Sequence, residues 1–142
     1  MPRTKLDLPA IFEFSTDIPL RITDINYGGH LGNDTLLSIL QEARLRFLQQ
    51  YAYSEKDVEG RGIIMLDAVV LYKAEAFYGD ILSVEVAVAD VGIHGCDLLY
   101  RVTNKASGKE VSRAKTSIAF FDYDRRKVVE VPEGFRNKFS PA

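Results

Sequence analysis

The chain of 142 residues has few of the residue types that carry specialised chemistry. It has no tryptophan, one cysteine (Cys96) and two histidines, His30 and His94. A single cysteine excludes an internal disulfide, which is typical of a reducing compartment, so we expect a cytoplasmic protein. Because Cys96 and the histidines form no closely spaced set of ligands, we predict no metal site.

Long hydrophobic runs are absent as well. No apolar segment approaches the roughly 20 residues that span a bilayer, so we predict no membrane partner. The first five residues, MPRTK, lead into a mixed segment and are not typical of a secretory signal. Neither a phosphate-binding P-loop nor a dinucleotide fingerprint is present, and we predict no cofactor.

The charges are nearly balanced, with 18 basic and 20 acidic residues and a formal net charge of -2. This balance gives no electrostatic reason to expect nucleic acid as a partner. Hydrophobic residues make up 46% of the chain, which is enough for a substantial core. We predict a single domain over residues 1–142, in which residues 1–10 form a loosely ordered N-terminal arm.

One segment has a strong helical pattern. Apolar residues recur every three or four positions after Asn33 and Asp34, either of which can cap a helix. Glu42 and Arg44 fall on the polar flank of this helix, where we expect an ordinary surface or interface ion pair. The apolar stripe predicts a helix of about five turns: Leu36, Leu40, Ala43, Phe47 and Tyr51.

Patterns typical of β-strands fill much of the remaining chain. Residues 11–22 contain β-formers interrupted by Pro19, which predicts an extended piece and an edge strand. A single helix covers only one face of a sheet, so the exposed face or edge should pair with another subunit. Runs of β-branched, aromatic or alternating residues between turn sequences predict an antiparallel meander: 62–74, 80–91, 97–104, 109–122 and 128–131.

Several short segments together resemble a known family. Residues 24–33 read DINYGGHLGN, and Glu42-Ala43-Arg44 follows on the predicted helix. The aromatic turn 77–80 (FYGD) and the closing segment 131–135 (VPEGF) come later. In order and spacing these pieces resemble the hotdog-fold acyl-CoA thioesterases around 4-hydroxybenzoyl-CoA thioesterase, over residues 17–135. The resemblance implies an α+β hotdog fold, in which a curved antiparallel sheet of five or six strands wraps a long central helix.

The resemblance also implies a function and a site. It points to hydrolysis of an acyl-CoA by a homodimer or homotetramer, at a subunit interface beside the N-terminus of the central helix. Asp24, Gly29, His30 and Asn33 stand where the family's pattern has its functional segment. One position departs from that pattern, because many relatives carry a carboxylate nucleophile or base where this chain has Asn26.

Thioester hydrolysis needs hydrogen-bond donors for the carbonyl oxygen, on which negative charge develops. The free N–H groups of a helix N-terminus supply such donors, and glycines let the backbone approach a ligand closely. Gly29, Gly32 and Asn33 are therefore predicted substrate-binding residues. By resemblance, the N–H groups near Gly32 and Asn33 would point at the carbonyl.

The reaction also needs a group that activates water. His30 can act as a base near neutral pH, or it can be a loop histidine that packs against the start of the helix. Asn26 cannot be a carboxylate nucleophile, but it can orient water or hold the thioester. Asp24 would share a side with Asn26 if the segment is extended, and it either replaces the missing carboxylate or bonds to the loop backbone.

Two further polar residues, Asp67 and His94, lie outside this segment. Asp67 lies within an apolar strand pattern, and it either faces solvent or lines the site of a neighbouring subunit. His94 lies in a predicted hairpin tip, and we assign it no catalytic role. Besides a thioesterase, the sequence leaves open a hotdog hydroxyacyl-thioester dehydratase and a non-catalytic acyl-thioester binding protein.

Overall fold

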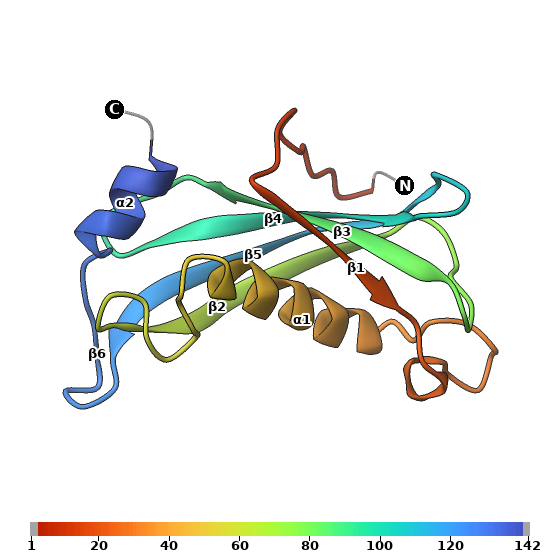
Figure 1. The fold of residues 1–142 in the computed structure, drawn as a ribbon, viewed down its shortest axis with the longest axis horizontal. Helices are drawn as coiled ribbons and strands as arrows, with labels where there is room; N and C mark the ends of the chain where they lie inside the picture. The colour runs from red at the N-terminus through yellow and green to blue at the C-terminus, as the bar shows by residue number, and fades with distance from the viewer. Residues whose placement is uncertain (1–2, 141–142) are drawn as a thin grey trace.

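The structure, a computed structural model, describes residues 3–140. Within this range six strands and two α-helices follow one another, with a short 3-10 helix after the first strand (Figure 1). The elements are β1 (Phe14–Pro19), η1 (Ile22–Asp24), α1 (Thr35–Gln49), β2 (Gly62–Tyr72), β3 (Ile81–Ala89), β4 (Gly95–Asn104), β5 (Glu110–Asp122), β6 (Lys127–Val128) and α2 (Glu133–Phe139).

The strands form one antiparallel sheet in the order β1-β3-β4-β5-β2, and β6 adds to β5. The sheet curves over α1, which lies along one of its faces (Figure 1). This arrangement confirms the predicted helix and the predicted number of strands. Two predictions are wrong in detail: the run 128–131 contributes only the end of β6, and the strands do not form a simple meander, because β2 pairs with β5 rather than with β3. The helix α2 was not predicted.

The core forms where α1 meets the sheet. The helix buries Leu36, Leu40, Ala43 and Phe47, as the apolar stripe predicted. Burial of one such large apolar side chain contributes about 1.5–3 kcal/mol. The helix ends at Gln49, so the last member of the stripe, Tyr51, follows the helix and packs against Phe47 with ring centroids 5.5 Å apart.

Arg44 is buried rather than placed on a polar flank, which corrects the predicted pairing of Glu42 with Arg44. Its Nε donates to Glu55 at 2.9 Å, and its Nη1 donates to the Tyr100 hydroxyl at 3.3 Å. Glu42 pairs instead with Arg46, one helical turn further along. The guanidinium of Arg44 therefore joins the helix to β4 and to the loop that precedes β2.

Residues 3–13 form neither a strand nor a helix. They run over the face of the sheet that points away from α1 (Figure 1). There the Leu6 carbonyl accepts a hydrogen bond from Arg113 Nη1 at 2.9 Å, and the Arg101 guanidinium lies 5.2 Å from the centre of the Phe12 ring. The N-terminal arm is attached to the sheet at least at these two points.

Two features are absent from residues 3–140. None of their helices combines the length and the apolar character that crossing a membrane requires. Within the same residues, no three His, Cys, Asp or Glu side chains gather closely enough to hold a metal ion.

We predict that Arg44→Met lowers the free energy of unfolding by about 2–3 kcal/mol, because Glu55 and Tyr100 lose a buried charged donor. Urea denaturation followed by circular dichroism measures this loss. Arg125→Met is the matched control, since Arg125 is exposed and its change should cost less than about 0.5 kcal/mol. Equal stability of the two variants would contradict the structural role of Arg44.

Candidate active site

The loop before α1 closes on itself through three hydrogen bonds. The N–H of Asn26 donates to the His30 carbonyl at 2.9 Å, and the N–H of Gly29 donates to the Asn26 carbonyl at 3.0 Å. The Asn26 side chain joins in, because its Oδ1 accepts from the N–H of Gly28 at 2.9 Å. Gly29 has a φ of +86°, a conformation that favours glycine. The turn 26–30 therefore has a defined shape.

Asn26 and His30 meet beside Gly28. A methyl group added to Gly28 would lie 3.2 Å from Asn26 Oδ1 and 3.4 Å from His30 Nε2. The other ring nitrogen of His30, Nδ1, lies 3.1 Å from the Leu31 carbonyl oxygen. Because a carbonyl only accepts, Nδ1 carries the proton of this bond, and Nε2 keeps a lone pair in the neutral ring. The lone pair of a potential base thus lies next to Asn26.

The start of α1 supplies backbone donors next to this turn, although one predicted donor is occupied. The N–H of Gly32 donates to the Asp24 carbonyl at 3.1 Å. Within residues 3–140, no hydrogen bond is found from the N–H of Asn33 or Asp34. Asn33 and Asp34, one residue later than predicted, therefore have free N–H donors at the helix start, and the same holds for Thr35.

His30, Gly32 and Asn33 line one cleft of about 310 Å³. Its opposite wall comes from the end of β2 and the segment that follows. The Tyr72 hydroxyl donates to the Asn33 carbonyl at 2.8 Å, and the N–H of Leu31 donates to the Ala76 carbonyl at 2.8 Å. Sequence reasoning missed Tyr72 as a support of the site, because its contact with residue 33 is made only in the folded chain.

Asp24 does not line this cleft. It ends η1, is buried, and its Oδ2 accepts a hydrogen bond from the N–H of Arg21 at 2.8 Å. Its side chain borders a different groove, which lies along α1 between Ser38 and Arg46. Asp24 ends η1 and borders this groove, whereas Asn26 lies beside His30, so the two side chains have different surroundings.

Asp67 is also remote from the cleft within one chain. It is exposed on β2, and its carboxylate lies 3.4 Å from Lys115 Nζ, on the face of the sheet that points away from α1. Cys96 is no candidate nucleophile, because burial raises the pKa of its thiol to about 12. Among the residues predicted for the site, the cleft brings together His30, Gly32 and Asn33, with Asn26 beside them.

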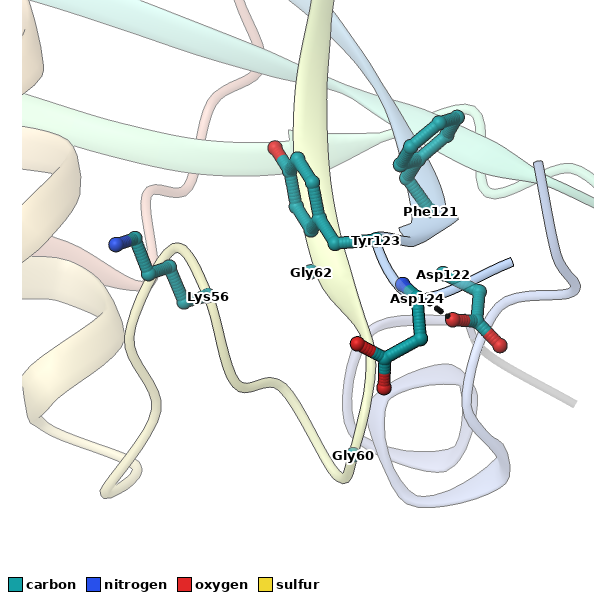
Figure 2. Close-up of a pocket in the computed structure, with 7 residues that line it drawn as sticks. All are labelled: Lys56, Gly60, Gly62, Phe121, Asp122, Tyr123 and Asp124. Atoms are coloured by element: carbon teal, nitrogen blue, oxygen red, sulfur yellow. Dashed lines mark hydrogen bonds between the residues drawn. The ribbon is translucent and has the colours of Figure 1, made fainter. Parts of the chain in front are cut away.

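A larger cavity of about 450 Å³ lies at the other end of β2, beside Gly62 (Figure 2). Tyr123 covers Gly62, and its hydroxyl donates to the Ile63 carbonyl at 3.0 Å. Lys56, Asp122 and Asp124 supply the charges of its wall. This cavity holds no histidine and no cysteine, so within one chain it lacks the base that the His30 cleft has.

The sequence model of the thioesterase-like superfamily matches residues 20–139. The chain belongs to this superfamily. The match begins just after β1 and covers η1, the turn 26–30, α1 and all later elements. No curated protein matches the sequence.

Solved structures of thioesterases have the same fold. The 1,4-dihydroxy-2-naphthoyl-CoA thioesterase of Synechocystis superposes with a TM-score of 0.80 at 19% identity, over 87% of this chain and 93% of that chain. The DHNA-CoA thioesterase of Staphylococcus aureus gives 0.77 at 21% identity, over 87% and 84% of the two chains. A thioesterase-superfamily structure from Jannaschia gives 0.82 at 17% identity, over 92% and 83%. The hotdog fold is thereby confirmed.

Membership of the thioesterase-like superfamily favours hydrolysis of a thioester. The His30 cleft has groups that this reaction needs, since it is lined by Asn33, whose N–H is free, and by a histidine whose Nε2 can accept a proton. Structural matches at 17–21% identity show a shared fold, but they do not identify the substrate.

We predict that Gly28→Ala leaves the fold intact and lowers kcat by at least about tenfold, because the methyl group occupies the space between Asn26 and His30. Thiol release from an acyl-CoA measures the effect. Gly92→Ala is the control, since an added methyl there meets no heavy atom closer than 3.8 Å. Full activity of Gly28→Ala would mean that no reacting group uses this space.

Proposed function

We propose that this protein is a cytoplasmic acyl-CoA thioesterase in which His30 is the general base and Asn26 orients the attacking water. The observation that carries the proposal is the convergence of Asn26 Oδ1 and His30 Nε2 beside Gly28, next to the free N–H groups of Asn33 and Asp34. A cleft with both a base and backbone donors supports acyl transfer to water.

The proposed reaction proceeds through direct attack of water. His30 Nε2 takes a proton from water as the oxygen bonds to the thioester carbon. The carbonyl oxygen becomes negative and accepts hydrogen bonds from Asn33 and Asp34, which would stabilise this charge. When the carbon–sulfur bond breaks, the protonated imidazole returns its proton to the leaving CoA thiolate. The products are a carboxylic acid and CoA.

The residue at position 26 determines which of two reaction routes is possible: attack by the enzyme or direct attack by water. A carboxylate at this position could attack the thioester and form an anhydride with the enzyme, whereas an amide cannot. Its Oδ1 already accepts from Gly28, and it can also accept from a water that His30 deprotonates. The direct route is therefore the one that this chain's residues support.

Asp24 has a supporting role in this proposal. Its carbonyl holds the N–H of Gly32, and its buried carboxylate holds the N–H of Arg21. It thus fixes the shape of the segment that leads to α1. Gly29 and Gly32 contribute backbone shape rather than donors, and Asp67 is left out because it lies on the other face of the sheet.

We further propose that two copies pair through β2. This strand is a sheet edge, and Met65 and Leu66 in its middle are 45% and 60% exposed. Two-fold antiparallel pairing sets the start of one β2 beside the end of the other. The cavity around Gly62 and Tyr123 (Figure 2) would then adjoin the partner's His30 cleft. Such a dimer, alone or doubled into a tetramer, adds a wall from the partner subunit to each cleft.

A non-catalytic acyl-thioester binding protein is the second candidate, and the amide at Asn26 favours it. A panel of short, long and aromatic acyl-CoAs assayed for thiol release separates the two. Turnover of any member supports the thioesterase. Binding of CoA without turnover of any member would support the binding protein.

We predict that His30→Ala lowers kcat by about 10²–10⁴-fold, the usual contribution of a general base. Asp24→Asn should keep most of the activity in the molecules that fold, whereas Asn26→Asp should keep or raise activity, because it restores the carboxylate that many relatives have. If Asp24→Asn abolishes activity and His30→Ala does not, Asp24 is the base.

We predict that the protein sediments as a dimer or tetramer at micromolar concentration. The double variant Met65→Asp/Leu66→Asp places four carboxylates at the paired edges and should give monomers with little activity. Sedimentation velocity and thiol release measure the two effects. A fully active wild-type monomer would exclude a site that needs the partner subunit.

A further inference from the structure

A second polar groove lies next to the candidate active site, on the face of the sheet that points away from α1. The N-terminal arm forms one wall with residues 3–7, and the other wall comes from Leu71, Lys73 and Arg113. Its volume is about 310 Å³. Lys73 also lines the His30 cleft, so the two cavities share a wall residue at the end of β2.

The groove has an excess of positive charge in a chain whose net charge is -2. Its lining includes four cations, Arg3, Lys5, Lys73 and Arg113, and one carboxylate, Asp7. Within residues 3–140, neither Arg3 nor Lys5 takes part in an ion pair. These two cations at the groove are free to meet an anionic ligand.

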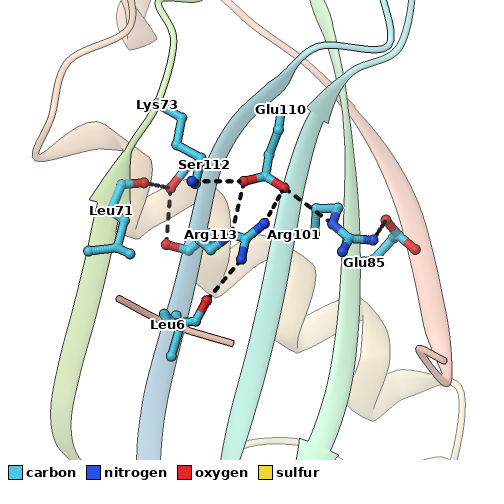
Figure 3. Close-up of polar contacts among 8 residues, drawn as sticks. All are labelled: Leu6, Leu71, Lys73, Glu85, Arg101, Glu110, Ser112 and Arg113. Carbon is cyan, nitrogen blue, oxygen red and sulfur yellow. Dashed lines mark hydrogen bonds and ion pairs between the residues drawn. The ribbon is translucent and has the colours of Figure 1, made fainter. Parts of the chain in front are cut away.

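Glu110 lies outside the groove and pairs with Lys73 and Arg113, but it does not neutralise the positive charge of the groove. Glu110 accepts two hydrogen bonds of 2.9 Å from Arg113, and it also lies 3.7 Å from Lys73 Nζ and 3.4 Å from Arg101 Nε (Figure 3). The bonds from Arg113 and the charges of Arg113, Lys73 and Arg101 lower the pKa of Glu110. A single carboxylate is therefore shared among three cations.

Contacts with the sheet hold the N-terminal arm in position beside the groove. Arg113 donates to the Leu6 carbonyl at 2.9 Å while it holds Glu110 with its other nitrogens (Figure 3). Further along, Phe12 lies under Arg101. These contacts keep Arg3 and Lys5 beside Lys73.

We propose that this groove binds the phosphate groups of the CoA carrier while its thioester lies in the His30 cleft. This inference rests on the proposed acyl-CoA function. CoA joins a flexible pantetheine arm to a diphosphate and a 3′-phosphate, so its reactive end and its charged end need two adjacent sites of different chemistry. Arginine and lysine are the side chains that bind phosphates.

The test compares thioesters that have the phosphates with one that lacks them. In the variant Arg3→Glu/Lys5→Glu, KM for an acyl-CoA should rise about tenfold while kcat stays unchanged, because carrier binding is lost equally from the ground and transition states. The matching acyl-pantetheine has no phosphate, and its KM should not change. Dephospho-CoA thioesters distinguish the 3′-phosphate from the diphosphate as the bound group.

Two variants of the same segment and a salt series serve as controls. Arg3→Lys/Lys5→Arg keeps both charges and should keep the wild-type KM. Asp7→Asn removes the negative charge and should lower KM for acyl-CoA. High salt should raise the wild-type KM for acyl-CoA and leave that for acyl-pantetheine nearly constant. Unchanged melting curves verify that the variants fold.

Calorimetric titration with CoA itself separates this inference from the proposed function. CoA binding that weakens about tenfold in Arg3→Glu/Lys5→Glu supports the groove, whether or not the protein hydrolyses thioesters. Equal CoA affinity and equal KM of variant and wild type would overturn the groove and leave the hydrolase standing. A wild type that neither binds CoA nor cleaves any thioester would overturn both.

Discussion

Burial of one face of α1 under the curved sheet is the constraint on which the site depends. The sheet covers the apolar stripe of α1, with Phe139 of α2 against Phe47, and this packing fixes the axis of the helix and the place where it starts. Arg44 adds a polar contact in the same interface by joining Tyr100 and Glu55. Because the helix start supplies the free N–H groups, the position of the candidate oxyanion site follows from hydrophobic packing.

From this fixed helix start, a short chain of hydrogen bonds positions the rest of the site. Gly32 is tied to Asp24, Leu31 to Ala76, and the Asn33 carbonyl to Tyr72. The turn 26–30 then has its two ends fixed, and Asn26 and His30 come together beside Gly28. The residue that shares this space with His30 is an amide rather than a carboxylate, so the proposed chemistry relies on an imidazole and water. The β2 edge and the basic groove adjoin the same cleft from two directions.

The sequence allowed the fold to be predicted because its signals are local. The stripe from Leu36 to Phe47 and the alternation of the strands depend only on spacing along the chain. Arg44 could not be placed, since its partners Glu55 and Tyr100 are distant in sequence. The surroundings of the Asp24 side chain depend on η1, and a helix of three residues has no periodic pattern in the sequence. The helix α2 had a usable signal that was missed: Glu133 in its first turn, Lys138 in its last, and Phe135 and Phe139 one turn apart.

The most direct test of the central claim is a crystal structure of the protein with an acyl-CoA analogue that cannot be hydrolysed. The account predicts that the analogue's carbonyl oxygen lies within hydrogen-bond distance of the N–H groups of Asn33 and Asp34. It also predicts that His30 Nε2 faces the reacting carbon across the space of one water molecule. A carbonyl bound in the groove beside Asp24, Ser38 and Arg46 instead, with the His30 cleft empty, would contradict the account.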